Sequence, residues 1–159
     1  MFLVLLIAFL CVGCDQATKA AAKSHLSGSA GLSFAGDTLR LQLTENKGAF
    51  LGLGSSLPDR WRALVFVWAA AVALGLLFAY VLVSSTSVES VVSLSLVLGG
   101  GFSNLLDRIA YGGFVIDFIN FGVGPVRTGI FNIADVAITS GVMILAWSSL
   151  RRRRALLPK

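Results

Sequence analysis

Long apolar stretches dominate this chain and predict helices that cross a membrane. A spanning helix needs about 20 largely apolar residues. Three stretches reach that length, at residues 2–22, 63–83 and 130–150, and a shorter one covers residues 91–106. We therefore expect an all-α membrane protein, a single domain over residues 1–159 with four transmembrane helices.

The polar connection at residues 23–62 is too long for a simple turn and shows a different pattern. Within it Leu39, Leu41 and Leu43 alternate with polar residues. Such alternation is typical of a half-buried strand. We expect this connection to form a small β-sheet cradle at the membrane surface.

The connections also predict the topology. Residues 84–90 form a tight hairpin between the second and third spans, whereas residues 107–129 form a second long connection. An even number of spans places both termini on one side and both long connections on the other. The basic block Arg151–Arg154 directly follows the last apolar stretch, and such a block marks a cytoplasmic helix end. We therefore expect cytoplasmic termini and an extracytoplasmic cradle.

Composition agrees with a membrane protein and argues against nucleic acid as a partner. Hydrophobic residues make up 56% of the chain and charged residues 13%, far from the balance of an ordinary globular domain. The net charge of +5 owes much to the C-terminal arginine block. No aromatic-interleaved basic surface accompanies that block, so we expect no nucleic-acid binding.

Cysteine and histidine suggest no metal or redox chemistry. Cys11 and Cys14 lie within the first apolar stretch, where we interpret them as buried small hydrophobic residues. The residues around Cys14 also resemble a lipoprotein cleavage box, but no Lys or Arg precedes the apolar run as a signal peptide requires. His25 is the one histidine, without neighbouring ligands, and we expect it at the surface. No metal site or cofactor is predicted.

Ionisable residues gather at one predicted depth. Asp15, Asp107 and Asp135 lie near span ends that all point to the extracytoplasmic side, and Asp117 lies in the second long connection. A carboxylate near hydrocarbon is costly unless it faces protein or water, so each is a candidate functional residue. The same predicted topology brings four more polar residues to this depth: Lys19, Asn104, Arg108 and Asn132. Glu89 falls at the opposite hairpin.

Helical spacing separates two interpretations of this cluster. Asp15 with Lys19 and Asn132 with Asp135 are four and three residues apart, so each pair can share a helix face. A polar belt that holds helices together explains Asp15, Lys19, Asp107 and Arg108 as well as direct chemistry does. Asp117 and Asp135 differ, because neither has a Lys or Arg within four residues. Two such carboxyls in a semi-apolar site favour a shared proton.

Five motifs follow one another in an order typical of one family. They are Asp15-Gln16-Ala17-Thr18-Lys19, Asn46-Lys47-Gly48-Ala49-Phe50, Gly100-Gly101-Phe102-Ser103-Asn104-Leu105-Leu106-Asp107-Arg108, Val115-Ile116-Asp117-Phe118 and Phe131-Asn132-Ile133-Ala134-Asp135-Val136-Ala137-Ile138. Together they resemble the motifs of lipoprotein signal peptidase, the signal peptidase II family of aspartyl proteases.

The resemblance implies the function and the site. It implies an endopeptidase of the bacterial inner membrane that cleaves diacylated prolipoproteins before the lipidated cysteine, with Asp117 and Asp135 as the catalytic pair. It further implies active-site lining by Asn46, Gly48, Asn104, Arg108, Asn132 and Ala134, with support from Asp15, Lys19 and Asp107. We also expect membrane lipid as a partner, inhibition by globomycin-type compounds, a monomer, and a first connection that covers the site as a cradle or lid.

One position departs from the family pattern. The third motif usually has Gly directly before its Asn, whereas this chain has Ser103. A side chain there is expected to tighten the approach of backbone or lipid, which leaves the catalytic assignment intact and the fine substrate preference open.

Two other function classes are compatible with intramembrane aspartates. A proton-coupled transporter or channel subunit uses them as a relay, but a relay crosses the membrane and these acids cluster at one face. A catalytically inactive relative that binds lipoproteins is the second, and the presence of both Asp117 and Asp135 argues against it.

Overall fold

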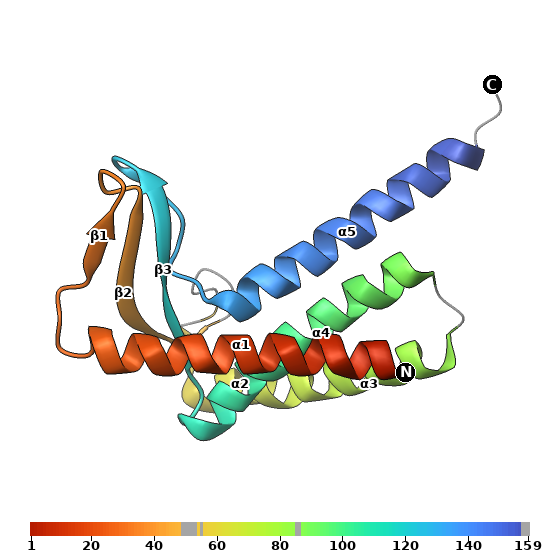
Figure 1. The fold of residues 1–159 in the computed structure, drawn as a ribbon. Helices are drawn as coiled ribbons and strands as arrows, with labels where there is room; N and C mark the ends of the chain where they lie inside the picture. The colour runs from red at the N-terminus through yellow and green to blue at the C-terminus, as the bar shows by residue number, and fades with distance from the viewer. Residues whose placement is uncertain (49–53, 55, 85–86, 157–159) are drawn as a thin grey trace.

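The computed structural model describes residues 1–48, 54, 56–84 and 87–156, with the backbone alone for residues 153–156. Four helices in the described chain are long and apolar enough to cross a membrane. They are α1 (Phe2–Leu26), the run of α2 (Asp59–Ala63), η2 (Leu64–Ala69) and α3 (Ala70–Val83), α4 (Val88–Ala110) and α5 (Ile133–Leu156). The predicted four-span architecture with a small antiparallel sheet is confirmed (Figure 1).

The helices extend past the predicted apolar stretches because polar end residues find partners inside the protein. Helix α4 continues through Asp107 and Arg108, and both side chains bond to other elements. At its other end Ser87 caps α4 by accepting a hydrogen bond from the Ser90 backbone N–H at 3.3 Å. Apolarity alone therefore underestimates helix length wherever a terminal turn is buried against protein.

Helix α4 is the central helix, and its glycines allow neighbours to approach closely. A Cβ on Gly99 would lie 2.7 Å from Cβ of Cys11 in α1, and one on Gly100 would lie 2.4 Å from the Ala134 carbonyl oxygen in α5. A Cβ on Gly141 of α5 would likewise lie 2.5 Å from the Ser93 carbonyl oxygen of α4. Only glycine permits these backbone contacts, so α1 and α5 are packed against α4 on two sides.

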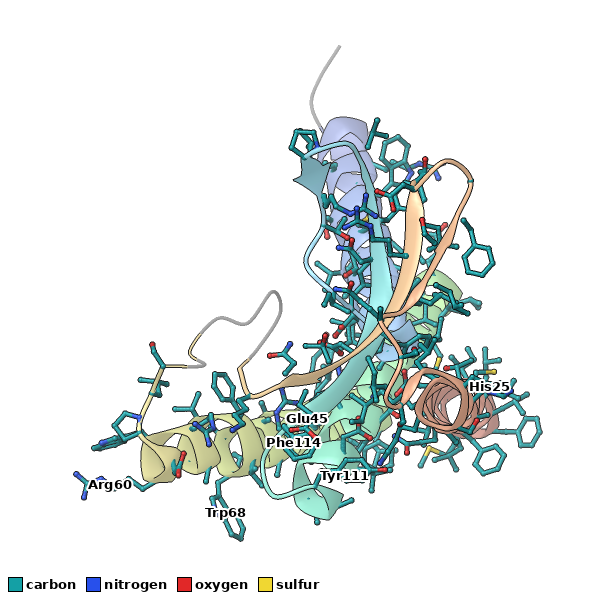
Figure 2. All side chains as sticks on the ribbon, turned by 90° about the vertical axis from the view of Figure 1, so that its left-hand side faces the viewer. His25, Glu45, Arg60, Trp68, Tyr111 and Phe114 are labelled. Carbon is teal, nitrogen blue, oxygen red and sulfur yellow. The ribbon has the colours of Figure 1, made fainter. Side chains whose placement is uncertain are left out.

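The outer faces of the spans suit a lipid environment. Phe9, Trp68 and Trp147 are exposed on α1, η2 and α5, and Figure 2 shows Trp68 pointing away from the rest of the protein. Cys14 is exposed rather than buried as predicted, because it falls on the outer face of α1. Neither cysteine is in a disulfide.

The sheet stands at one end of the helices (Figure 1). Its antiparallel strands follow the order β1 (Leu32–Phe34), β2 (Leu39–Asn46), β3 (Val115–Val123) and β4 (Val126–Arg127). Strand β2 confirms the predicted half-buried strand, since most of its residues are partly buried and Leu41 and Leu43 pack on a cluster around Ala22 and Leu26 of α1. The sequence reasoning did not identify β3, because its first four residues are buried and show no polar alternation.

Strand register joins distant motifs. Thr44 lies opposite Asp117 and Asn46 opposite Val115, after a register shift between Leu41 and Thr44. A bridge between Ile119 and Phe131 then brings β3 to the start of α5. The second, fourth and fifth sequence motifs therefore meet at the base of the sheet.

The opposite end of the bundle holds the basic block. Arg152 donates to the Ser90 hydroxyl at 3.1 Å, so the last turns of α5 lie beside the start of α4. The N-terminus lies at this end too (Figure 1). The start of α1 and the described end of α5 thus lie at the end of the bundle opposite the sheet.

Candidate active site

A cavity of about 550 Å³ lies below the base of the sheet. Helix α4 contributes its back wall, and η2 with α3 and α5 contribute its two sides. Both predicted catalytic residues line it, together with Asn46, Asn104 and Arg108. The other lining residues are Phe66, Ala70, Ala73, Leu74, Val97, Gly101, Val115, Ile138, Thr139, Val142 and Met143. The cavity is therefore an apolar hollow with a small polar end.

Asp117 lies on β3 and is held by two asparagines. Asn132 donates its side-chain amide to Oδ1 at 2.7 Å, and Asn46 donates to Oδ2 at 2.9 Å. The carboxyl is only 1% exposed. Both hydrogen bonds fix its orientation, so its remaining lone pairs face the cavity that it lines.

Burial changes the acidity of this carboxyl. Loss of hydration raises the pKa of Asp117 to about 7, although the hydrogen bond from Asn46 opposes the rise. The neighbouring charge of Asp135 raises the pKa further. An ionised carboxylate loses solvation when buried near a like charge, so Asp117 retains a proton at mildly acidic pH.

Asp135 lies in the first turn of α5 and forms a reciprocal cap with Asn132. The Asp135 backbone N–H donates to the Asn132 side-chain oxygen at 2.9 Å, and the Asn132 backbone N–H donates to Asp135 Oδ2 at 3.2 Å. Asn104 of α4 donates to the other carboxylate oxygen at 3.0 Å. Asn132 thus precedes α5 as its cap. The prediction that it shares a helix face with Asp135 is therefore wrong.

Two asparagines join the carboxyls into one unit. Asn132 contacts Asp117 through its amide nitrogen and Asp135 through its amide oxygen. Its nitrogen also donates to the side-chain oxygen of Asn104 at 3.1 Å, and Asn104 in turn donates to Asp135. The relative position of the two carboxyls is therefore determined by a closed set of hydrogen bonds between β3, α4 and α5.

A buried ion-pair network supports these asparagines from the side of α1. Lys19 Nζ lies 2.6 Å from Asp15, 2.8 Å from Asp107 and 3.0 Å from the Asn104 side-chain oxygen. Asp107 also accepts the Ile116 backbone N–H at 3.1 Å. All three charged residues are at least 97% buried. The polar-belt interpretation therefore fits Asp15, Lys19 and Asp107.

Ser103 belongs to the same network. Its hydroxyl donates to Asp15 Oδ2 at 2.6 Å and accepts from the Gln16 side-chain amide at 3.0 Å. The side chain is fully buried, and Asp15 uses its other oxygen to accept the Ala134 backbone N–H at 2.8 Å. Ser103 therefore faces α1 and is not among the residues that line the cavity.

Arg108 closes the polar end of the cavity. Its guanidinium donates to the Gly48 carbonyl oxygen at 2.8 Å and to the Asn104 carbonyl oxygen at 3.1 Å. It also lies over the ring of Phe66, 5.7 Å from the ring centre. Within the described chain its Nε has no hydrogen-bond partner. Arg108 thereby ties the end of β2 to α4 and leaves a cation beside the two carboxyls.

Three predicted lining residues have other positions. Ala134 is fully buried against Gly100, Asn132 is fully buried between the carboxyls, and buried Gly48 presents its carbonyl to Arg108. They shape the site without lining it. Ala49 and Phe50 of the second motif lie outside the described residues. His25 is exposed near the end of α1, as expected (Figure 2).

The apolar walls were not predicted. Phe66 lies in the π-helical segment η2, and Leu74 and Met143 come from α3 and α5. Within uniformly apolar spans nothing in the sequence separates cavity-facing from lipid-facing residues. Thr139 is the exception, because it follows Asp135 by one helical turn and its position could have been predicted from that spacing.

Comparison with known proteins identifies the family. A family model described as signal peptidase (SPase) II matches residues 7–151. The chain belongs to the signal peptidase II family. It is thus a protease, and the predicted resemblance is confirmed.

Relatives cover almost the whole chain. A lipoprotein signal peptidase of Syntrophus aciditrophicus is 33% identical over 155 residues, covering 97% of this chain and 96% of its own. Those of Moorella thermoacetica and Francisella tularensis subsp. mediasiatica are 35% and 34% identical, covering 92% and 91% of this chain and 91% and 89% of their own. This signal peptidase II therefore matches bacterial relatives over nearly the whole of both chains, and its four apolar helices make it a multi-pass membrane protein.

Solved structures agree with the fold. A bacterial membrane enzyme determined at 2.3 Å resolution superposes with a TM-score of 0.85 at 25% identity, covering 100% of this chain and 94% of its own. A second, determined at 1.9 Å resolution, gives a TM-score of 0.77 and 24% identity over 94% of each chain. The arrangement of four spans and a sheet is thus shared with membrane enzymes.

Proposed function

We propose that this signal peptidase II is an aspartic endopeptidase that removes the signal peptide from diacylglyceryl-modified bacterial prolipoproteins, cutting before the lipidated cysteine. The observation that supports the mechanism most strongly is that Asp117 and Asp135 line one cavity and both bond to Asn132. The relatives named lipoprotein signal peptidase support the substrate class.

The two carboxyls have different environments and so different roles. Asp117 is buried, with a pKa raised to about 7, and it holds the shared proton. Asp135 is more exposed than Asp117, and with the one shared proton on Asp117 it is the ionised partner of the pair. Asp135 therefore acts as general base and Asp117 as general acid.

The reaction follows from these protonation states. Asp135 removes a proton from a water molecule while the water oxygen attacks the scissile carbonyl carbon. Protonated Asp117 donates to the carbonyl oxygen and stabilises the tetrahedral intermediate. The intermediate then collapses, the carbon–nitrogen bond breaks, and the proton held by Asp135 passes to the departing amine of cysteine. Neither a metal nor a covalent intermediate is needed.

The cavity walls suit the apolar end of a signal peptide. Leu74 of α3, Val97 of α4, and Ile138 and Met143 of α5 all line it. A signal segment already in the bilayer reaches this hollow laterally between the second and fourth spans, without leaving an apolar environment. Burial of apolar side chains there is worth about 25 cal/mol per Å².

The arrangement of charges supports an extracytoplasmic site with cytoplasmic termini. The basic residues Arg151 and Arg152 lie at the end of α5 opposite the sheet, where Arg152 contacts the start of α4. Basic residues next to a span favour the cytoplasmic side. The cavity lies at the other end, where exported substrates arrive.

A proton-relay transporter is a weaker candidate. A relay needs titratable groups along the full depth of the bundle, whereas the buried charged residues of the described spans, Asp15, Lys19 and Asp107, lie together beside the cavity. A binding protein without catalysis would not need Asp117 and Asp135 joined through shared asparagines. Monomeric state, bound lipid and inhibition by globomycin-type compounds stay predictions.

The function is tested with the purified full chain and a synthetic prolipoprotein peptide. The peptide should be cut at the bond before cysteine when that residue carries diacylglyceryl, and the product should show a free cysteine amine by mass spectrometry. Activity should survive EDTA and be blocked by globomycin. Cleavage that requires a divalent metal, or the absence of cleavage in a folded preparation, would overturn the proposal.

A further inference from the structure

A second hollow of about 390 Å³ lies on the other side of Asp135. Its lining residues are Arg127, Thr128, Gly129, Phe131, Asp135, Val136, Thr139 and Ser140. It shares Asp135 and Thr139 with the catalytic cavity. Asp135 therefore stands between two hollows, one walled by α3, α4 and α5 and the other by α5 and the segment between β4 and α5.

This second hollow has hydrogen-bond donors on an apolar floor. Thr128, Thr139 and Ser140 contribute hydroxyls, Arg127 contributes a guanidinium, and Phe131 and Val136 contribute apolar surface. Apart from Asp135 itself, none of its lining residues is acidic. Such a lining suits a ligand with hydrogen-bond acceptors and attached hydrocarbon.

Arg127 is fixed in place and still has donor capacity. Its Nε donates to the Asn120 side-chain oxygen at 2.5 Å, and Nη1 donates to the Asp37 carbonyl oxygen at 2.7 Å. Its Nη2 is buried and has no partner within the described part of the chain. A buried donor without a partner is costly, so a bound acceptor in this region would recover that cost after a small side-chain adjustment.

The charges around Arg127 are not balanced. Asp37 is shared between Arg127, at 3.5 Å, and Arg40, which forms a two-pronged contact with it. The hydrogen bond from Arg40 keeps the pKa of Asp37 well below its usual range, so Asp37 stays ionised. Two guanidinium groups thus share one carboxylate, and the cluster retains one positive charge next to the hollow.

Substrate geometry indicates what this hollow receives. With the scissile carbonyl at the carboxyls, the peptide must leave in two directions. The catalytic cavity takes the apolar segment before the cut, so the second hollow lies next to the residue after the cut. That residue is the lipidated cysteine, whose glyceryl group has two ester carbonyls, which accept hydrogen bonds, and two acyl chains.

We propose that this hollow binds the glyceryl ester group of the lipidated cysteine, and that Arg127 donates a hydrogen bond to an ester carbonyl oxygen. The inference rests on the proposed function, because it takes the cleaved bond to lie at Asp117 and Asp135. Arg127 then determines specificity for the lipid linkage, although it lies in none of the five sequence motifs.

The test compares two synthetic lipopeptides that differ only in the lipid linkage. One has the natural diester, and the other has a diether, which has the same chains but lacks both carbonyls. In detergent without added lipid, the wild-type chain should cleave the diester with a kcat/KM about tenfold higher, the effect expected for one hydrogen bond to a charged donor. Arg127→Met should cleave both equally, because the ester has lost its donor.

A matched variant isolates the contact. Arg60→Gln removes an exposed guanidinium on α2, outside both the Asp37 cluster and the second hollow, and should keep the wild-type preference for the diester. If Arg127→Met does not fold, Arg127→Gln, which can still donate to Asn120, replaces it in the comparison. Equal cleavage of both lipopeptides by the wild-type chain, or an unchanged preference in the Arg127 variants, would overturn the inference.

Membrane lipids also contain ester carbonyls and could occupy the hollow. The assay is therefore repeated in nanodiscs of diester or diether phospholipid. In both kinds of nanodisc the wild-type chain should cleave the diester lipopeptide faster than the diether lipopeptide. A rate that follows the linkage of the bulk lipid instead assigns the hollow to membrane lipid and overturns the inference. If neither lipopeptide is cleaved at all, it is the proposed function that fails.

Discussion

The Asn132 side-chain nitrogen lies 2.7 Å from Oδ1 of Asp117. The same asparagine caps α5 by accepting the Asp135 backbone N–H. One residue thus joins a strand and a helix that arrive from different parts of the chain. The hydrogen bonds of Asn132 set the geometry of the site, while the acidity of Asp117 follows from burial near a second carboxyl.

The raised pKa of Asp117 predicts how stability varies with pH. An unfolded Asp loses its proton near pH 4, whereas Asp117 in the folded chain loses it near pH 7. Between these values the folded state binds more protons, so the contribution of Asp117 to stability falls as pH rises from about 4 to about 7. Asp117→Asn should therefore be more stable than the wild type at pH 8, by up to about 4 kcal/mol.

Thermal unfolding followed by tryptophan fluorescence checks this prediction. The stability difference should shrink as pH falls toward 4, and the wild-type kcat/KM should fall as pH rises through about 7 because the general acid is lost. A stability difference that is the same at pH 4 and pH 8 would contradict the assignment of the proton to Asp117.

Replacement of Lys19 should lower stability strongly, although Lys19 does not line the cavity. Lys19→Met leaves Asp15 and Asp107 buried without their shared cation. Removal of one partner from a buried ion pair costs about 3–5 kcal/mol. Lys23→Met, one turn further along α1, removes a cation–π contact with Tyr111 and should cost about 1 kcal/mol or less. Similar unfolding temperatures for the two variants would show that the network adds little.

Replacement of Ser103 by glycine should change stability and not substrate choice. Ser103→Gly removes a donor to Asp15 and an acceptor for Gln16 and places glycine inside α4. These changes should cost about 2 kcal/mol in all. The relative kcat/KM for peptides with Ala or Gly before the cysteine should not change. A shift in that ratio would mean that Ser103 acts on the cavity after all.

Close packing of α4 against α5 predicts the effect of one methyl group. Gly100→Ala places Cβ 2.4 Å from the Ala134 carbonyl oxygen, so α5 must move and Asp135 with it. We expect an unfolding cost of about 1–3 kcal/mol and a loss of activity. The matched variant is Gly75→Ala in α3, where nothing lies within 4 Å, and it should preserve both. Equal activity of the two variants would contradict the role of this contact.

Sequence patterns predicted the spans, strand β2 and both carboxyls, for identifiable physical reasons. Spans are long apolar runs, β2 alternates because one face packs on Leu26, and uncompensated acids in an apolar chain are rare enough to identify. Other features depend on packing that no local pattern records. Strand β3 is buried on both faces, Asn132 acts as a cap instead of sharing a helix face, and Ser103 turns toward α1.

Arg127 shows why long-range contacts escape sequence reasoning. Its partners Asp37 and Asn120 lie 90 and 7 residues away, and only the antiparallel pairing of β2, β3 and β4 brings them together. Nothing in the sequence around Arg127 distinguishes it from an exposed basic residue of a turn.

The central claim is that Asp117 and Asp135 perform the cleavage together. Asp117→Asn and Asp135→Asn should each lower kcat/KM for a diacylated prolipoprotein peptide by at least about 10³-fold. Glu89→Gln, an exposed acid at the opposite end of α4, should cleave like the wild type. Wild-type cleavage by either Asn variant, with folding verified by thermal unfolding, would contradict the account.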